Sequence, residues 1–122
     1  MITKIVVMGG FCSGVNGYVT HSSTEILDVN TMTWGIGPNL PIDVFDHKGV
    51  QSVSETYLGF SIGGYCSKLR SCKDGYSKAQ SKIFGLKKTN ENVYVWEEVH
   101  NMTTARWSHS VVNAPKNLLP NC

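Results

Sequence analysis

Long apolar runs and helical periodicity are both missing from this 122-residue sequence. No stretch approaches the roughly 20 apolar residues that a membrane-spanning helix needs. Residues 1–10 lack the basic region, apolar run and cleavage site of a signal peptide. No window repeats apolar residues at positions i, i+3, i+4 and i+7, so we expect little helix. The sequence therefore predicts neither a membrane helix nor a helix-rich fold.

Charge is also scarce. Charged residues make up 16% of the chain and hydrophobic residues 41%, a balance typical of a folded core and not of disorder. The net charge of +2 is too small to indicate nucleic-acid binding by itself. Only four prolines stand against twelve glycines, and Ser, Thr, Val and Asn are frequent, which favours strands joined by turns.

The cysteines show no zinc-binding pattern. They are separated by 54, 6 and 50 residues, whereas zinc sites pair cysteines about two to four residues apart, so we predict no metal site. Cys66 and Cys72 could close a disulfide loop in an oxidising compartment, where the sequon Asn101-Met102-Thr103 could also be glycosylated. Without a targeting segment a cytoplasmic protein with ordinary thiols is the default expectation, and an extracellular location stays open. The four cysteines are Cys12, Cys66, Cys72 and Cys122.

Basic residues gather in one segment. Seven of the eleven fall within 68–88, where Asp74 is the only acidic residue. We interpret this segment as a solvated, lysine-rich loop, and docking of an acidic partner surface is the alternative. Nucleic-acid or membrane binding ranks last, because aromatic residues are sparse there and no amphipathic helix is evident. The seven residues are Lys68, Arg70, Lys73, Lys78, Lys82, Lys87 and Lys88.

The chain contains an internal repeat, which is the strongest signal in the sequence. Residues 8–13 match 62–67 at an offset of 54. Between this block and the next, 25–28 aligns best with 82–85 at an offset of 57, which predicts insertions of three and then five residues in the second copy. Such insertions are typical of connections between stacked units. The second block holds four pairs at an offset of 62, which are Trp34 with Trp96, Leu40 with Met102, Phe45 with Trp107 and His47 with His109.

Each copy predicts short strands separated by polar turns, so we predict an all-β fold. Residues 5–8 form a continuous apolar run, as expected for a strand buried on both faces. Their counterpart alternates, with Leu58, Phe60 and Ile62 on one side. The predicted strands that follow are 24–29, 32–36, 49–53, 81–86, 93–99 and 108–113.

Structural roles explain the recurring residues better than ligand binding does. A glycine pair at the end of an apolar strand permits positive φ, and it lets another backbone approach closely. Burying an indole hides roughly 200 Å² and yields about 3 kcal/mol, so we expect each repeated tryptophan to wedge between successive units. We interpret the two repeated histidines as packing or hydrogen-bonding residues, not as catalysts.

An apolar strand, a Gly-Gly-aromatic turn, a second strand, a tryptophan and a later arginine and histidine resemble the kelch repeat. The resemblance covers nearly the whole chain, to about Ala114. In that family each repeat of roughly 50 residues folds into a four-stranded blade of a β-propeller. Two positions depart from the pattern, because Val44 replaces the arginine in the first copy and Phe84-Gly85 stands where the first copy has Leu27-Asp28. The structural repeat positions are Gly9, Gly10, Trp34, Gly63, Gly64, Trp96 and Arg106.

The resemblance implies a partial propeller, with one complete four-stranded blade flanked by an incomplete blade on each side. A propeller needs at least about four blades to close. We therefore expect a fragment of a longer protein. The alternative is self-assembly through unpaired blade edges, in which a strand at 107–113 completes the first blade of another copy and several chains form a ring. The implied division is 1–46 (incomplete blade, strands near 4–8, 24–29 and 32–36), 47–99 (complete blade, long loop 65–81) and 100–122 (first strand of a further blade, and a tail).

The function implied by the resemblance is protein–protein interaction without catalysis. The chain would belong to a larger scaffold or substrate-adaptor protein, of ubiquitin-ligase adaptor or actin-associated type, and we predict no catalytic, cofactor-binding or metal-binding residues. Loops on one propeller face would bind the partner, and 65–81 holds residue types favoured at binding hot spots. The alternative is a fragment of a kelch-like propeller enzyme (oxidase, epimerase or specifier type), although no catalytic set stands at diagnostic spacing. The candidate partner-binding residues are Tyr65, Arg70, Lys73 and Tyr76.

Overall fold

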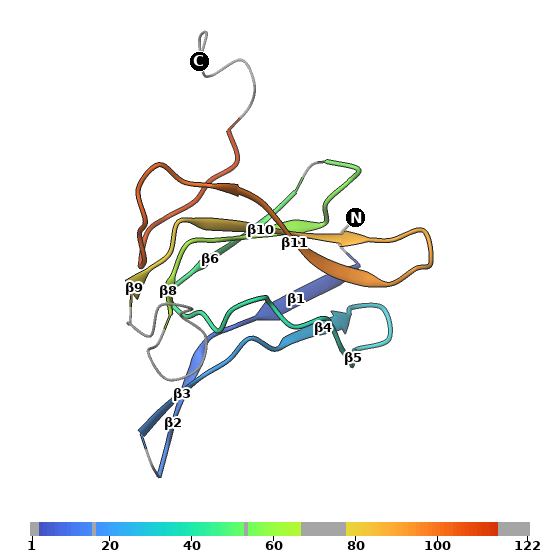
Figure 1. Ribbon diagram of the computed structural model, residues 1–122. Helices are drawn as coiled ribbons and strands as arrows, with labels where there is room; N and C mark the ends of the chain where they lie inside the picture. Colours follow the sequence, from blue (N-terminus) through green and yellow to red (C-terminus); the bar gives the residue numbers. More distant parts are fainter. Residues whose placement is uncertain (1–2, 16, 53, 67–77, 115–122) are drawn as a thin grey trace, which may run out of the picture.

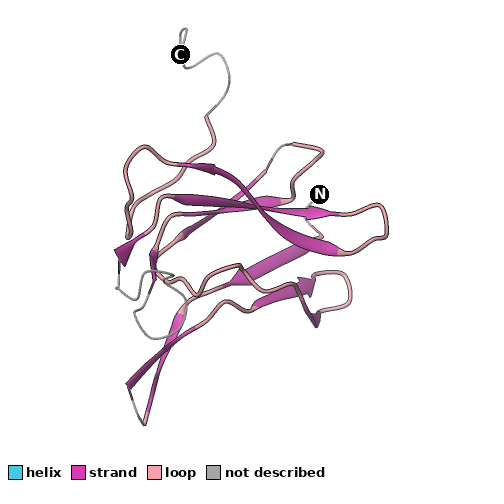
Figure 2. Cartoon of the chain, in the orientation of Figure 1, coloured by secondary structure: helices cyan, strands magenta, loops and turns pink. Residues whose placement is uncertain are grey.

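The computed structural model describes residues 3–15, 17–52, 54–66 and 78–114, arranged as Figure 1 shows. These residues form strands and connections and contain no helix, so the predicted all-β class is confirmed (Figure 2). None of them belongs to a helix long and apolar enough to cross a membrane. In chain order the strands are β1 (Lys4–Met8), β2 (Phe11–Gly14), β3 (Gly17–Thr20), β4 (Thr24–Asp28), β5 (Thr33–Ile36), β6 (Lys48–Gln51), β7 (Gly59–Ile62), β8 (Tyr65–Cys66), β9 (Lys78–Ala79), β10 (Lys82–Lys88) and β11 (Tyr94–Asn101).

The first sheet has three antiparallel strands in the order β1-β4-β5. The apolar run of β1 is not buried on both faces as predicted. Val6 and Met8 are half-buried, whereas Ile5 and Val7 are 48% and 47% exposed. The side chains of a strand alternate between two faces, and only one face of this sheet is covered by the described part of the chain.

The second sheet has four antiparallel strands in the order β11-β10-β7-β6, so the chain meanders from one edge to the other. It lies above the first sheet in the view of Figure 1. The inner strand β10 carries Phe84 and Leu86, which are 3% and 1% exposed. This burial is expected from the central position of β10, because an inner strand is covered on both edges and packs at least one face on the core.

The core contains residues from both sheets and from the connection between them. Its buried cluster consists of Leu40, Val44 and Phe84, and the residues packed against it are Met8, Ile42 and Trp96. Leu40 and Val44 come from the segment between β5 and β6, so this connection is a part of the core and not a surface loop.

The two repeated tryptophans have different surroundings. The indole Nε1 of Trp96, in the second sheet, donates hydrogen bonds of 3.0 Å to Thr24 Oγ1 and 3.1 Å to the Pro38 carbonyl oxygen. Trp96 therefore joins the second sheet to the first, as predicted. Trp34 is 56% exposed, so the predicted wedge role fails for it within the described chain, where no preceding sheet lies against it.

The sheet registers correct the alignment of the two copies. Leu27 pairs with Trp34, and Leu86 pairs with Trp96. Leu86 therefore corresponds to Leu27 at an offset of 59, and the predicted offset of 57 for this strand is wrong. The pair Ile83-Phe84 in β10 resembles Ile26-Leu27 in composition, which is why the sequence match favours the offset of 57. The register is fixed instead by the residue that lies across the ladder. The offset grows from 54 to 59 and then to 62, so the insertions are five and then three residues.

The strand predicted at 107–113 does not form. These residues correspond to 45–51 of the first copy, which include β6. Because β-strands are stabilised by their ladder partners, β6 is ordered as a strand by its pairing with β7. No strand in the described residues stands beside 110–113 in the same way. We call residues 4–51 the first repeat and 58–113 the second repeat.

Candidate interaction surface

Two glycine turns lead the chain from the sheets into hairpins. Gly9 and Gly10 have φ angles of 63° and 99°, and Gly63 and Gly64 have 62° and 103°. Glycine adopts such positive values readily because it lacks a Cβ, and the sequence predicts this use for both pairs. The first turn leads into hairpin β2–β3 and the second into β8–β9. Both hairpins lie on the left of Figure 1.

The connection 40–47 lies between the two glycine turns. The Gly10 N–H donates a 2.7 Å hydrogen bond to the Val44 carbonyl oxygen. On the other side, Phe45 and Tyr65 exchange backbone hydrogen bonds of 3.1 and 2.8 Å. Val44 is 1% exposed. The connection therefore holds the two hairpins in fixed relative positions.

Four aromatic rings follow one another along this end of the molecule, and we call them the aromatic row. Successive ring centroids are 5.2, 5.4 and 5.4 Å apart, within the range of attractive aromatic contacts. The two end members, Phe11 and Trp107, are each 50% exposed. The row crosses both repeats and presents apolar rings to solvent. Its members, in order, are Phe11, Phe45, Tyr65 and Trp107.

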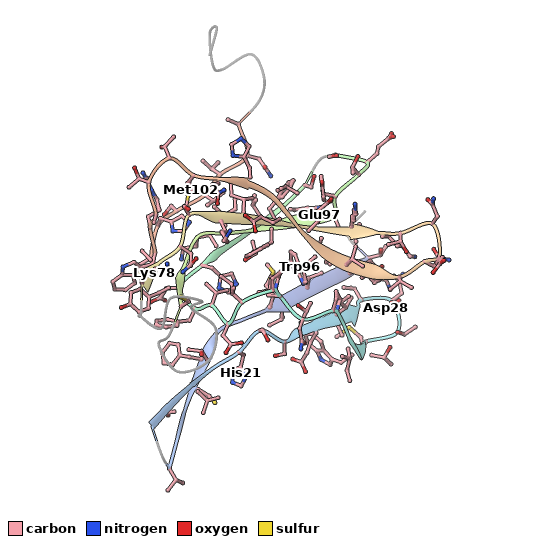
Figure 3. The ribbon with its side chains drawn as sticks, in the orientation of Figure 1. His21, Asp28, Lys78, Trp96, Glu97 and Met102 are labelled. Atoms are coloured by element: carbon pink, nitrogen blue, oxygen red, sulfur yellow. The ribbon has the colours of Figure 1, made fainter. Side chains whose placement is uncertain are left out.

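The structure describes one of the four predicted partner-binding residues. Tyr65 lies in β8 and is the third ring of the aromatic row. Arg70, Lys73 and Tyr76 lie outside the described residues. Lys78, in β9, is carried by the strand that pairs with β8, and Figure 3 labels it on the same side as the hairpins. The described ends of the predicted loop 65–81, in β8 and β9, therefore lie beside the aromatic row.

The basic segment 68–88 does not form one continuous patch among its described residues. Lys82 Nζ lies 2.6 Å from Glu98 Oε1, and Lys87 Nζ lies 2.9 Å from Glu97 Oε2. The Tyr57 hydroxyl also donates a 2.9 Å hydrogen bond to Glu97. The bond from Lys87, and next the bond from Tyr57, lower the pKa of Glu97. Two of the lysines are thus paired with acids on the second sheet and are no part of a free basic surface.

A thiol and an imidazole meet at the first hairpin. Cys12 Sγ lies 3.3 Å from His21 Nε2, and Cys12 is a free, exposed cysteine. Cys66, at the corresponding place in the second repeat, is disulfide-bonded and accepts a 2.9 Å hydrogen bond from Gln80 Nε2. Its predicted partner Cys72 lies outside the described residues. Sequence reasoning missed the Cys12–His21 pair because the β2–β3 hairpin, and not a spacing motif, brings these side chains together.

The repeated histidines lie under the glycine turns. A Cβ on Gly9 would lie 2.8 Å from His47 Cε1, and a Cβ on Gly63 would lie 2.8 Å from His109 Cε1. Burial lowers the pKa of His47 below its ordinary value of 6.5. Both side chains therefore pack against backbone, as we interpret them from the sequence. Among the described residues no three His, Cys, Asp or Glu side chains are grouped to hold a metal ion.

Comparisons with known proteins find no matching family model and no matching curated protein. Functional inference therefore depends on the geometry of the chain. The feature of this geometry that bears most directly on function is the aromatic row, because exposed aromatic rings on loops beside a rigid scaffold are typical of protein-binding surfaces.

Proposed function

We propose that the chain is built from kelch-type propeller units and acts as a non-enzymatic protein–protein interaction module of scaffold or adaptor type. Three features support the unit assignment. The glycine pairs have nearly equal φ angles at equivalent positions. The strands pair in equivalent registers around Leu27 and Leu86. Trp96 packs between successive sheets, as a repeated wedge residue should.

The partner binds at the aromatic row, together with the loop that includes Arg70, Lys73 and Tyr76. The single observation that carries this assignment is the continuous run of four rings, exposed by half at Phe11 and Trp107. Aromatic side chains dominate the energetics of protein interfaces, since each can bury a large area at a small cost in side-chain entropy. The mixture of rings with lysine and arginine fits a protein surface with apolar pockets and acidic groups.

Affinity capture with the purified protein as bait tests the proposal. The variants are Tyr65→Ala and the triple variant Arg70→Ala, Lys73→Ala, Tyr76→Ala, compared with wild type on extract of the source cells. The matched control is Val93→Ala, because Val93 is also half-exposed, at 52%, but lies in the turn between β10 and β11. We expect both sets of changes to lower recovery of a captured protein at least about tenfold. Capture that is equal for all variants, or no capture by wild type, would contradict the proposal.

A further inference from the structure

The two repeats differ in what covers their first strand. In the second repeat β7 is paired on both edges, by β10 and by β6. In the first repeat β1 pairs with β4, and no strand of the described residues pairs with its other edge. β6 itself belongs to the first repeat, so the first repeat supplies the strand that completes the sheet of the second. The open edge of β1 borders a hollow between the sheets, whose walls include Val6, Val50 and Trp96.

The equivalent glycines Gly10 and Gly64 also differ. A Cβ added to Gly64 would meet the side chain of Val44, and it would lie 2.7 Å from His47 Cβ and 2.9 Å from the Phe45 carbonyl oxygen. A Cβ added to Gly10 would meet nothing within 4 Å. The connection 40–47 of the preceding repeat fills the space at Gly64. The corresponding space at Gly10 is open.

Trp34 and Trp96 repeat this difference at a third place. Trp96 donates to groups of the preceding sheet, at Thr24 and Pro38, whereas the equivalent Trp34 is 56% exposed. The second repeat thus contacts the first at three places, namely the edge of β7, the space at Gly64 and the indole of Trp96. The equivalent places on the first repeat, at β1, Gly10 and Trp34, lack such a contact within the described chain.

The segment 106–113 carries the matching surface. Asp46 and Ser108, which correspond at an offset of 62, both have a φ of 50°, so the chain turns in the same way after each connection. The Gly64 N–H donates a 2.9 Å hydrogen bond to the Arg106 carbonyl oxygen, the equivalent of the bond from Gly10 to Val44. Beyond this turn, Val112 is 84% exposed. The second repeat thus presents the same connection as the first, and no strand of the described residues receives it.

We propose that residues 110–113 of one copy pair with the open edge of β1 in a second copy, so that the protein assembles head to tail. The pairing of β6 with β7 fixes the register, because Lys48 pairs with Ile62 and Val50 with Phe60. The equivalent intermolecular pairs are Ser110 with Met8 and Val112 with Val6. The side chains of Arg106 and His109 then fill the space at Gly10, and Trp34 packs on the second sheet of its neighbour.

Such contacts are heterologous and build rings when the rotation between copies closes. Each copy, with its received strand, completes two four-stranded sheets. Propellers typically contain about four to eight blades, so the ring contains about two to four copies. The inference rests on the repeat part of the proposed function. By the same equivalence Trp107 of one copy meets Phe11 of the next, as Phe45 meets Tyr65, so the aromatic row continues from copy to copy. Loss of partner capture by the Tyr65→Ala variant would leave the assembly standing.

Size-exclusion chromatography with light scattering gives the first readout. We expect one species whose mass is a small whole multiple of the 13.4 kDa chain. A 13.4 kDa species at concentrations up to about 1 mM would mean a Kd for assembly above about 1 mM. That result would overturn the proposal, and so would a polydisperse aggregate.

Gly10→Ala is the sharpest variant, and Gly17→Ala is its matched control. The two glycines have φ angles of 99° and 105°, and a Cβ on either would meet nothing within 4 Å in one chain. Both changes therefore impose the same backbone strain on the monomer. We expect Gly10→Ala alone to weaken assembly, by about tenfold or more, because its Cβ occupies the space of the second copy. Equal effects of the two changes would overturn the proposal.

Disulfide trapping tests the register. In a Cys12→Ser background, Val7→Cys protein is mixed with Val111→Cys protein and oxidised, and the cross-linked peptides are identified by mass spectrometry. These positions face each other in the proposed ladder, so we expect a mixed disulfide between them. The control mixture combines Val7→Cys with Val93→Cys, another exposed valine, and should give at most about one tenth of that product. Equal yields in the two mixtures, or no mixed disulfide at 7 and 111, would overturn the proposed register.

Discussion

The two sheets are built from successive copies of one repeated sequence pattern, yet the second sheet is complete and the first is open. The second sheet has four strands, and its inner residues Phe84 and Leu86 are almost fully buried, at 3% and 1% exposure. The first sheet has three, and its edge strand exposes Ile5 and Val7 by 48% and 47%. The difference arises from position, because the second sheet receives β6 from the repeat before it. In repeat proteins much of the stability of a unit lies in its contacts with neighbours.

This comparison predicts that equivalent substitutions have unequal effects in the two repeats. The inequality should be largest where the second repeat contacts the first most closely. It should be smallest for exposed groups that depend only on local contacts.

Gly64→Ala should destabilise the protein most. The new Cβ would lie 2.7 Å from His47 Cβ and would require φ near 103°. Steric overlap and backbone strain together cost about 4 kcal/mol. The equivalent Gly10→Ala meets nothing within 4 Å and should cost about 2 kcal/mol, from strain alone. Urea unfolding at low protein concentration measures both, and equal losses would show that the two glycine turns are not distinguished by the connection.

Trp96→Ala should come next, at about 3 kcal/mol, because the indole packs on the core cluster and bonds to Thr24 and Pro38. Trp34→Ala should cost less than about 1 kcal/mol in the monomer, since Trp34 is 56% exposed. The two urea midpoints give the comparison directly. A larger loss for Trp34 than for Trp96 would contradict the placement of Trp96 between the sheets.

Much of the fold could be predicted because its signals are local. Apolar strands and glycine pairs are readable from a few neighbouring residues, and they locate β1, β4 and β5 to within one or two positions. The register of β10 could not be read in this way. It depends on the pairing of Leu86 with Trp96 across the ladder, and the sequence match of 82–85 with 25–28 is a competing local signal.

The candidate surface was only partly predictable for the same reason. Sequence comparison relates Phe45 to Trp107 and the aromatic residue Phe11 to Tyr65, each within its own motif. Nothing in either motif says that the two kinds of position meet. They meet because the Phe45–Tyr65 backbone bridge carries a connection onto the next hairpin. A contact between repeats, and not within one, therefore creates the row.

A smaller effect should appear as a pH dependence of stability. Burial, before all else, lowers the pKa of His47, so the unfolded chain binds this proton more tightly than the folded chain does. Stability is therefore complete above the ordinary pKa of 6.5 and falls as the pH drops from 6.5 through the lowered folded value. The surrounding groups are the Met8 backbone and Asp46, which raise the pKa, and Lys48 and His109, which lower it.

Urea midpoints measured between about pH 7 and pH 5 test this dependence. We expect His47→Asn to reduce the fall in midpoint that the wild type shows over this interval. The control His100→Asn changes an exposed histidine and should leave the fall unchanged. If both variants kept the wild-type pH profile, burial of His47 would not be a source of acid sensitivity.

The smallest effect should come from Lys4, although its Nζ lies only 2.8 Å from Asp28 Oδ2. Both side chains are partly exposed, and exposed ion pairs add little to stability, so Lys4→Ala should leave the urea midpoint unchanged within error. Asp28→Ala should lower it measurably, because Asp28 Oδ1 also accepts bonds from the Asn30 and Thr31 N–H groups, at 2.9 and 3.2 Å. The second repeat has Lys87 at the corresponding position and a longer turn, so this dependence on a carboxylate belongs to the first repeat alone. Equal losses for the two variants would show that the ion pair, and not the turn, is the stabilising contact.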